Sequence, residues 1–297
     1  MTSRSRAEFV LLGVTLAWGG SFLVVKNTLA TLPPLWLIAL RFALAAAVLA
    51  LAFRGKAFAL GQGASGRSHW RTAVWIGALL WAAFAFQTAG LVYTTPARSG
   101  FITATYVAFV PLLARVVLRR RLRKRVLVAV GAALAGLILL TDARAGGANF
   151  GDALTLLGAL AFAAHILALD RFASAMPAPA LAFAQMAVVA GLSIPLALAF
   201  ETTPHALDLP GIAAIAYLGV ICSAVGFLGQ TWGQRHTTPI RVGLIFSLES
   251  LFAALLSVAI GAEVLTPWQW FGGLMLVGGV LIGELPEDAA PQPARAD

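Results

Sequence analysis

The heptapeptide Thr94-Thr95-Pro96-Ala97-Arg98-Ser99-Gly100 returns 143 positions later as Thr237-Thr238-Pro239-Ile240-Arg241-Val242-Gly243. The two copies share Thr, Thr, Pro, Arg and Gly, a match that chance rarely gives. At the same offset Phe84 aligns with Phe227, Gln87 with Gln230 and Gly90 with Gly233. At an offset of 144, Trp18 aligns with Phe162, Ser21 with His165 and Arg41 with Gln185. The sequence therefore predicts an internal repeat.

Each copy of the repeat contains five apolar runs. A bilayer core about 30 Å thick requires about 20 apolar residues of helix. Pro after Thr marks several of the helix starts. The predicted spans are 8–29, 34–53, 71–92, 97–118, 126–141, 152–170, 179–200, 210–233, 239–260 and 267–284.

The composition excludes a water-soluble fold. Hydrophobic residues make up 60% of the chain and charged residues 11%, with a mean hydropathy of +0.88. Soluble domains carry about 25% charged residues. The single cysteine, Cys222, excludes an intrachain disulfide framework and a thiolate metal cluster. The net charge of +9 is no nucleic-acid signal, because the cations stand in short clusters between apolar runs.

The loop charges predict the orientation. Lys and Arg gather in the segments that share a side with the N-terminus, whereas Asp142, Asp152, Glu201, Asp208 and Glu263 fall on the other side. The positive-inside rule then places both termini in the cytoplasm. The Arg-rich, Ala-rich composition is typical of a high-GC bacterial genome. We therefore expect a multi-pass protein of the bacterial inner membrane, with a disordered cytoplasmic tail at 285–297.

One basic run supports two interpretations. It can anchor the topology, or it can bind anionic lipid headgroups. Arg98 and Arg241, each two residues after a Thr-Thr-Pro helix start, are expected to anchor at headgroups or to contact a gate. The run comprises Arg119, Arg120, Arg121, Arg123, Lys124 and Arg125.

An odd number of spans in each repeat forces the second copy to enter the membrane from the opposite side. The predicted fold is all-α and integral to the membrane, with ten helices as two inverted five-helix repeats at 8–141 and 150–284. Inverted repeats are typical of secondary transporters, whose sites lie near the midplane. A duplicated scaffold without transport is the rival interpretation.

Polar side chains within the spans weigh against an inert scaffold, because ionisable groups are costly at membrane depth and usually face a cavity or a partner. Gln87 and Gln230 can bind a ligand or bridge helices, while Trp18 and Tyr106 can line a cavity or only pack. The candidate substrate-binding residues are Trp18, Ser21, Arg41, Gln87, Tyr106, His165, Gln230 and Glu249.

Three ionisable residues near the midplane have alternative roles. Glu249 can carry a proton or bind an ammonium group, and Arg41 can bind a substrate carboxylate. Alternatively, the two form a structural ion pair, or Arg41 extends outward to the interface. His165 can line the cavity or make a hydrogen-bonded helix contact.

The runs 126–141 and 267–284 have few polar residues and many glycines, such as Gly131, Gly136, Gly272 and Gly278. Small residues allow helix backbones to approach closely in a membrane. We expect these two runs to be packing helices or the interface of a homodimer.

The chain resembles the drug/metabolite transporter superfamily, in its EamA-like branch. The resemblance implies two EamA domains, a central cavity, and transport of small metabolites such as amino acids, often by export with proton or exchange coupling. One departure is Ser250, where the family usually has Pro, so we expect a straighter helix there. The matching segments are Ala17-Trp18-Gly19-Gly20-Ser21-Phe22 with Lys26, Leu40-Arg41-Phe42, Tyr93-Thr94-Thr95-Pro96-Ala97, Phe109-Val110-Pro111-Leu112-Leu113, Ser247-Leu248-Glu249, Phe252-Ala253-Ala254-Leu255, Gly261-Ala262-Glu263 and Leu265-Thr266.

The sequence thus favours a secondary transporter, exporter or exchanger, of a small polar or zwitterionic metabolite. A channel or structural membrane protein is the alternative. A membrane enzyme is disfavoured, because no paired acid motif, His cluster or nucleophile with its base is present. We expect no catalytic residues, metal or cofactor. The sequence contains no Gly-rich loop followed by Lys-Ser/Thr, so it does not support a nucleotide-driven pump.

Overall fold

The computed structural model describes residues 2–61, 69–117, 119, 122–140, 149–204, 207–259 and 264–285. In that part of the chain all regular secondary structure is helical. Eight helical segments are long and apolar enough to cross a membrane, which confirms the predicted class. They are Ser3–Thr28, Pro34–Phe53, Trp70–Tyr93, Pro96–Val116, Phe150–Ala175, Ala178–Phe200, Leu209–Gly233 and Pro239–Ala259.

Four of these segments are divided within their length, and a fifth, Phe150–Ala175, ends in a short 3-10 turn. Two of the breaks, at Thr105 and Leu248, stand 143 positions apart. The segments divide as α1 (Ser3–Gly19) and α2 (Ser21–Thr28); α6 (Pro96–Ala104) and α7 (Tyr106–Val116); α11 (Leu209–Ala216), the π-helical η2 (Tyr217–Val225) and α12 (Gly226–Gly233); and α13 (Pro239–Ser247) and α14 (Glu249–Ala259).

Proline starts several helices as the sequence predicts. Pro96, Pro239 and Pro267 are each the first residue of a helix, where a missing N–H costs nothing. The Thr95 side chain also accepts from the backbone N–H of Arg98. The remaining elements are α3 (Pro34–Phe53), α4 (Gly55–Phe58), α5 (Trp70–Tyr93), α8 (Lys124–Leu140), α9 (Phe150–Phe172), η1 (Ala173–Ala175), α10 (Ala178–Phe200) and α15 (Pro267–Glu284).

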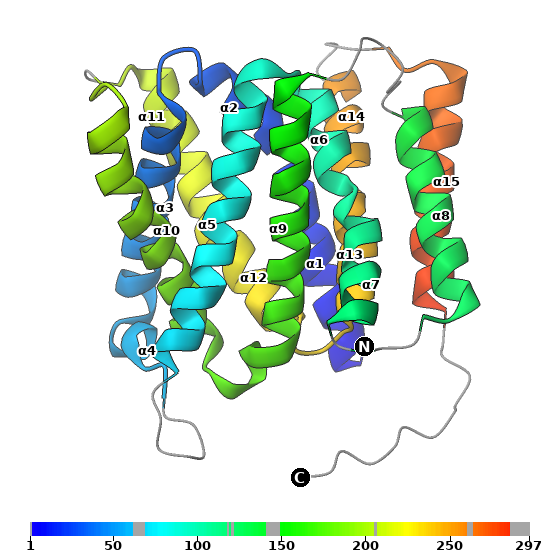
Figure 1. The fold of residues 1–297 in the computed structure, drawn as a ribbon, viewed down its shortest axis with the longest axis horizontal. Helices are drawn as coiled ribbons and strands as arrows, with labels where there is room; N and C mark the ends of the chain where they lie inside the picture. Colours follow the sequence, from blue (N-terminus) through cyan, green and yellow to red (C-terminus); the bar gives the residue numbers. More distant parts are fainter. Residues whose placement is uncertain are drawn as a thin grey trace.

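Helices α8 and α15 pack along each other at one edge of the bundle (Figure 1). A Cβ at Gly136 would lie 2.5 Å from the Leu276 backbone N, and one at Gly272 would lie 2.5 Å from the Leu140 N. The glycines therefore allow backbone contact, as the sequence predicts for a packing pair. Neither helix is among the eight candidate spans: α8 has 17 residues, and α15 starts with the polar and interfacial stretch Pro267-Trp268-Gln269-Trp270.

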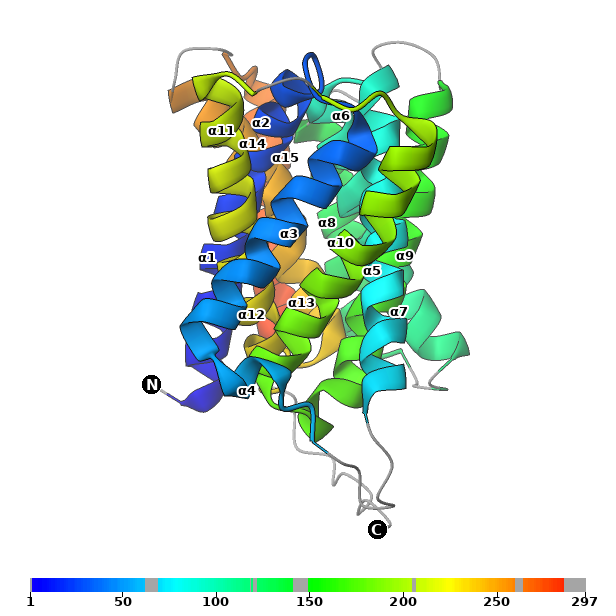
Figure 2. The same ribbon diagram turned by 90° about the vertical axis from the view of Figure 1, so that its left-hand side faces the viewer.

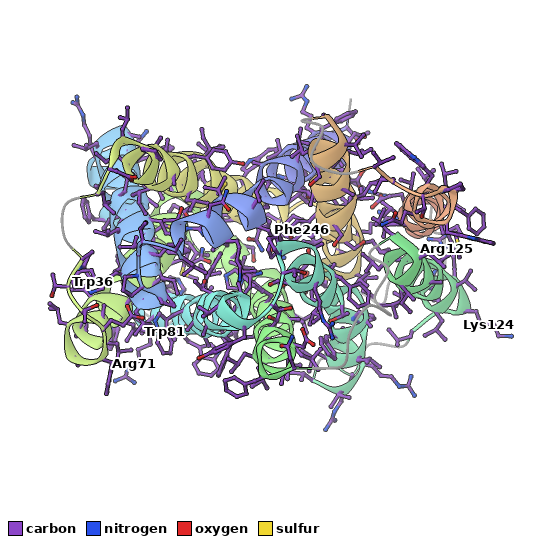
Figure 3. The ribbon with its side chains drawn as sticks, turned by 90° about the horizontal axis from the view of Figure 1, so that it is seen from above. Trp36, Arg71, Trp81, Lys124, Arg125 and Phe246 are labelled. Atoms are coloured by element: carbon purple, nitrogen blue, oxygen red, sulfur yellow. The ribbon has the colours of Figure 1, made fainter. Side chains whose placement is uncertain are left out.

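The bundle has two end faces, seen at the bottom and top of Figures 1 and 2. We call the face with the start of α1, α4 and the end of α15 the N-terminal face, and the other, with the starts of α3 and α11, the distal face. In the predicted lipid-binding run, Arg120 and Arg121 lie outside the described residues, as do residues 286–297 of the predicted tail. Lys124 and Arg125 lie at the outer edge of the bundle (Figure 3), and Arg125 donates to the Leu285 carbonyl across 2.8 Å.

Candidate functional site

A cavity of about 40 Å³ lies inside the bundle, between residues from both halves of the chain. Its walls are mainly aromatic, with a few polar groups. Phe246, one of the aromatic residues, lies near the centre of the view from above (Figure 3). The lining residues are Trp18, Ser21, Arg41, Phe84, Gln87, Thr103, Tyr106, Phe162, Ile166, Phe227, Gln230, Phe246 and Glu249.

The cavity brings together all the predicted site residues except His165. The sequence interpretation missed the lining residues Phe84, Phe162, Phe227 and Phe246, along with Thr103 and Ile166. A signal for the aromatic residues existed: Phe84 and Phe227 align in the repeat, and so do Trp18 and Phe162.

Several of the lining residues occupy corresponding positions in the two halves of the chain. Gln87 and Gln230 are 143 residues apart, as are Tyr106 and Glu249. Phe84 and Phe227, also 143 apart, hold their ring centroids 5.9 Å from each other. Corresponding positions of the two halves therefore meet at one cavity.

Glu249 is the first residue of α14 and is only 7% exposed. The Tyr106 hydroxyl donates to its Oε2 across 3.4 Å. The Ser250 hydroxyl donates to the Gly100 carbonyl across 3.1 Å and ties α14 to α6. The segment is interrupted at Leu248, next to Glu249, and the expectation of a straighter helix at Ser250 stays a prediction.

Arg41, on α3, is 2% exposed and reaches the cavity from its side. Its Nε donates to Ser223 Oγ across 3.1 Å, and its guanidinium carbon lies 4.9 Å from the Phe84 ring centre. Among the described residues no ion pair joins Arg41 to Glu249, so the structural-pair interpretation is wrong. Arg41 is held instead by a hydroxyl and by aromatic faces, which leaves its charge available at the cavity wall.

His165 lies outside the cavity lining, which corrects its expected placement there. It is fully buried, and its Nε2 shares a 2.7 Å hydrogen bond with Gln185 Oε1. The Gln185 amide in turn donates to Thr231 Oγ1 across 3.2 Å. His165 therefore joins α9 to α10 and α12, as the alternative interpretation of a helix contact has it.

The two glutamines have different partners. Gln87 Nε2 donates to Thr103 Oγ1 across 3.0 Å, and Gln230 Nε2 donates to Gln234 Oε1 across 2.7 Å. The Oε1 of Gln230 is buried without a hydrogen-bond partner. A buried acceptor without a donor is costly, so this oxygen is suited to receive a ligand N–H or O–H.

Trp18 is fixed by the π-helical segment η2. Gly226 donates its N–H to the Ile221 carbonyl, five residues earlier, and the Cys222 carbonyl accepts the indole N–H of Trp18 across 2.8 Å. The Trp18 ring then lies 5.2 Å from the Phe227 ring centre and 5.0 Å from that of Phe246. The altered hydrogen-bond register of η2 thus positions an aromatic wall of the cavity.

At the distal face an ion pair links the two halves of the chain. Arg98 on α6 contacts Asp152 on α9 with 2.6 Å between Nη2 and Oδ2, and its Nε donates to Oδ1 across 2.9 Å. The Thr94 hydroxyl also donates to this carboxylate, across 3.1 Å. The expected headgroup anchor at Arg98 is therefore an ion pair between helices.

A second ion-pair cluster lies at the N-terminal face. Arg241 on α13 is 6% exposed and lies 3.7 Å from Glu284 and 3.9 Å from Glu8. Arg4 contacts the same two carboxylates, at 2.6 Å for Glu8 and 3.0 Å for Glu284. Arg241 therefore joins α1 to α13 and α15 instead of anchoring at headgroups.

Metal ligation has no support in the described part of the chain, where no group of three or more His, Cys, Asp or Glu side chains is placed to hold an ion.

The model of the EamA-like transporter family matches residues 5–142 and again residues 149–283. The chain belongs to the EamA-like transporter family. Its relatives include an uncharacterized transporter of Archaeoglobus fulgidus, 33% identical over 95% of this chain and 87% of that protein. The uncharacterized inner membrane transporter YedA of Escherichia coli K12 is 26% identical over 92% of this chain and 89% of its own.

A further relative of this EamA-like transporter is a probable amino-acid metabolite efflux pump of Salmonella typhimurium. It is 26% identical, over 92% of this chain and 93% of its own. A solved crystal structure, 21% identical, superposes with a TM-score of 0.79 over 95% of this chain and 97% of its own, which shows the shared fold. The family and the three named relatives all carry transporter or efflux-pump names.

Proposed function

We propose that this EamA-like protein is a secondary transporter built as two inverted five-helix repeats, at 8–141 and 150–284. The observation that carries the proposal is the convergence of positions 143 apart on one cavity, with Tyr106 hydrogen-bonded to Glu249. Breaks at Thr105 and Leu248, directly before these two residues, are the kind of helix interruption that forms transporter sites.

Ten spans follow if α8 and α15 are the fifth span of each repeat. They close the two halves, at corresponding places in the sequence, and pack against each other through Gly136 and Gly272. The two family matches, 5–142 and 149–283, each end with one of these helices.

The substrate we propose is a small polar or zwitterionic metabolite such as an amino acid. Arg41 supplies a cation at one part of the cavity wall, and Glu249 supplies a carboxyl group for an ammonium group or a coupled proton. Gln230 Oε1 offers a further acceptor, and the aromatic rings offer an apolar surface. The name of the Salmonella relative supports this class and the direction of efflux.

The small size of the cavity supports alternating access. Its 40 Å³ can hold only about two or three waters, so a metabolite must enter after the halves separate. Arg98–Asp152 joins the halves at the distal face, and Arg241 with Glu8 joins them at the N-terminal face. We infer that opening either side breaks the ion pair of that side.

In the cell, we propose a place in the bacterial inner membrane with the N-terminal face toward the cytoplasm. The exposed cations Arg123 and Lys124 then lie on the cytoplasmic side, where they can contact anionic headgroups. YedA is named as an inner membrane transporter, which supports this location.

Counter-flow in proteoliposomes tests the proposal. Vesicles loaded with a mixture of amino acids should accumulate the labelled form of one of them transiently and saturably. Uptake that is linear in concentration and insensitive to the internal load would indicate a channel. If Glu249→Gln and Arg41→Ala both transport at the wild-type rate, the central site is wrong.

A further inference from the structure

A second hollow lies at the distal face, between α2 and α11, which run side by side there (Figures 1 and 2). Its volume of about 430 Å³ is roughly ten times that of the central cavity. Asn27, Thr31 and Asp208 line it with exposed side chains, and Thr28 lines it with a buried one. Val24, Pro210, Ala213 and Ala214 form an apolar part of its wall, so the cleft combines polar groups with an apolar surface.

One face of α2 runs from the central cavity into this cleft. Ser21 lines the cavity, while Val24, Asn27 and Thr28 line the cleft. These positions are three or four residues apart, so they lie on the same side of the helix. Ser21 and Val24 are separated by only about 4.5 Å along the axis. The two hollows are therefore neighbours along one helix face.

Tyr217 stands between the two hollows. It lines the cleft, and its hydroxyl donates to the Ala17 carbonyl across 2.6 Å, at the end of α1. A Cβ at Gly20, one residue before the cavity-lining Ser21, would lie 3.2 Å from that hydroxyl. The phenol thus covers the chain at the break between α1 and α2.

The single cysteine of the chain lies directly behind this phenol. Cys222 is fully buried, and its Sγ lies 3.6 Å from the same Ala17 carbonyl that accepts from Tyr217. The Cys222 carbonyl holds the indole of Trp18 in the cavity wall. Any opening at Tyr217 therefore exposes a thiol next to the central site.

We propose that the cleft between α2 and α11 is the distal-side access route for the solute, and that the Tyr217 side chain closes it. The proposal rests on the transporter function proposed above and adds the path and the closing residue. When the Tyr217 hydroxyl leaves the Ala17 carbonyl, the cleft beside Thr28 and Val24 becomes continuous with the central cavity at Ser21.

The test uses Cys222 as the native reporter. An anionic methanethiosulfonate that cannot cross the bilayer is applied to spheroplasts, which present one face, or to inside-out vesicles, which present the other. Its sulfinate group leaves as the thiolate forms the mixed disulfide. Wild-type Cys222 should react slowly. In Tyr217→Ala it should react at least about tenfold faster from the distal face alone, because removal of the phenol exposes a thiol otherwise reached only in rare open conformers.

Matched variants keep the result interpretable. Tyr217→Phe removes only the hydroxyl, which donates to Ala17 and lies beside the Cys222 thiol, and should give a smaller increase, so a misfolded Tyr217→Ala protein does not decide the outcome. Ala214→Trp fills the cleft and should slow the reaction in both backgrounds. Val74→Ala, at the repeat-related position near the other face, should leave the rate unchanged, and Cys222→Ala should give no signal.

Three outcomes would overturn the route. The first is an unchanged rate in both Tyr217 variants. The second is faster labelling from the N-terminal face. The third is an increase seen only with the membrane-permeant N-ethylmaleimide, which would make the cleft a lipid-facing groove. If the labelling rates change as expected but no counter-flow is measured, the route is supported and the transporter function is rejected. If counter-flow is measured but the labelling rate does not depend on Tyr217, the route alone is rejected.

Discussion

Tyr106 and Glu249 occupy corresponding positions in the two halves of the chain, and the phenol of one donates to the carboxylate of the other across 3.4 Å. Each is the first residue after a helix break. An acid and its hydrogen-bond donor therefore meet where the two halves meet. A change of protonation at Glu249 would therefore alter the hydrogen bond that joins the two interrupted segments.

Glu249→Gln should remove proton-driven transport. Glutamine keeps the size and a hydrogen-bonding oxygen for Tyr106 but cannot exchange a proton at working pH. We expect uptake driven by a pH gradient to fall by at least about tenfold, while exchange of labelled for unlabelled amino acid falls less. Tyr106→Phe is the matched variant and should retain coupling with weaker transport. Equal pH-driven uptake in wild type and Glu249→Gln would remove Glu249 from coupling.

Arg41→Lys should weaken binding of a carboxylate-bearing substrate, although the positive charge remains. Lysine lacks the Nε–H that Ser223 accepts and the planar group that lies against Phe84. We expect about tenfold lower affinity for an amino acid and no change for the amine without its carboxylate, measured by thermal shift in detergent. Parallel losses for the two ligands would assign Arg41 to structure alone.

Gly136→Ala should destabilise the protein. The added methyl would lie 2.5 Å from the Leu276 backbone N and push α8 from α15, at a cost of about 1–3 kcal/mol. Gly131→Ala is the control on the same helix, because a Cβ there meets nothing within 4 Å. The melting temperature in detergent should fall for the first and hold or rise for the second. Equal melting of both variants would show that the backbones are not in contact.

Arg98→Asp and Asp152→Arg should each impair transport, and the double exchange should partly restore it. Each single change places two like charges opposite each other at a partly buried contact, where the wild-type atoms are 2.6 Å apart. A double-mutant cycle on melting temperature and counter-flow should give a coupling of about 0.5–3 kcal/mol. Additive losses would mean that the contact does not link the halves.

Much of the fold could be predicted from the sequence because the apolar runs and the internal repeat are both strong signals. Apolar length locates most helices, and the Thr-Thr-Pro repeat aligns the halves at positions such as Gln87 and Gln230. The polar members of the cavity follow, since a polar side chain in a span needs a partner or a cavity.

Other features could not be predicted for physical reasons. In a membrane protein both the lipid-facing and the inward-facing sides of a helix are apolar, so apolar character does not mark Phe246 as a cavity residue, and Phe84 stands out only through its alignment with Phe227 in the repeat. The partners of Arg41 and His165 are neutral side chains on other helices, Ser223 and Gln185, which no spacing reveals. The ion pair of Arg98 with Asp152 likewise depends on how α6 packs against α9.

The length of α15 has a consequence for the surrounding lipid. Its 18 residues extend only about 27 Å, with a capped start at Thr266 and Glu284 at the other end. If α15 is the tenth span, as proposed above, a hydrocarbon layer about 30 Å thick must thin beside it, even where the helix stands upright next to α8. Shorter acyl chains should therefore gather along this edge, and the protein should be most active in membranes that supply them.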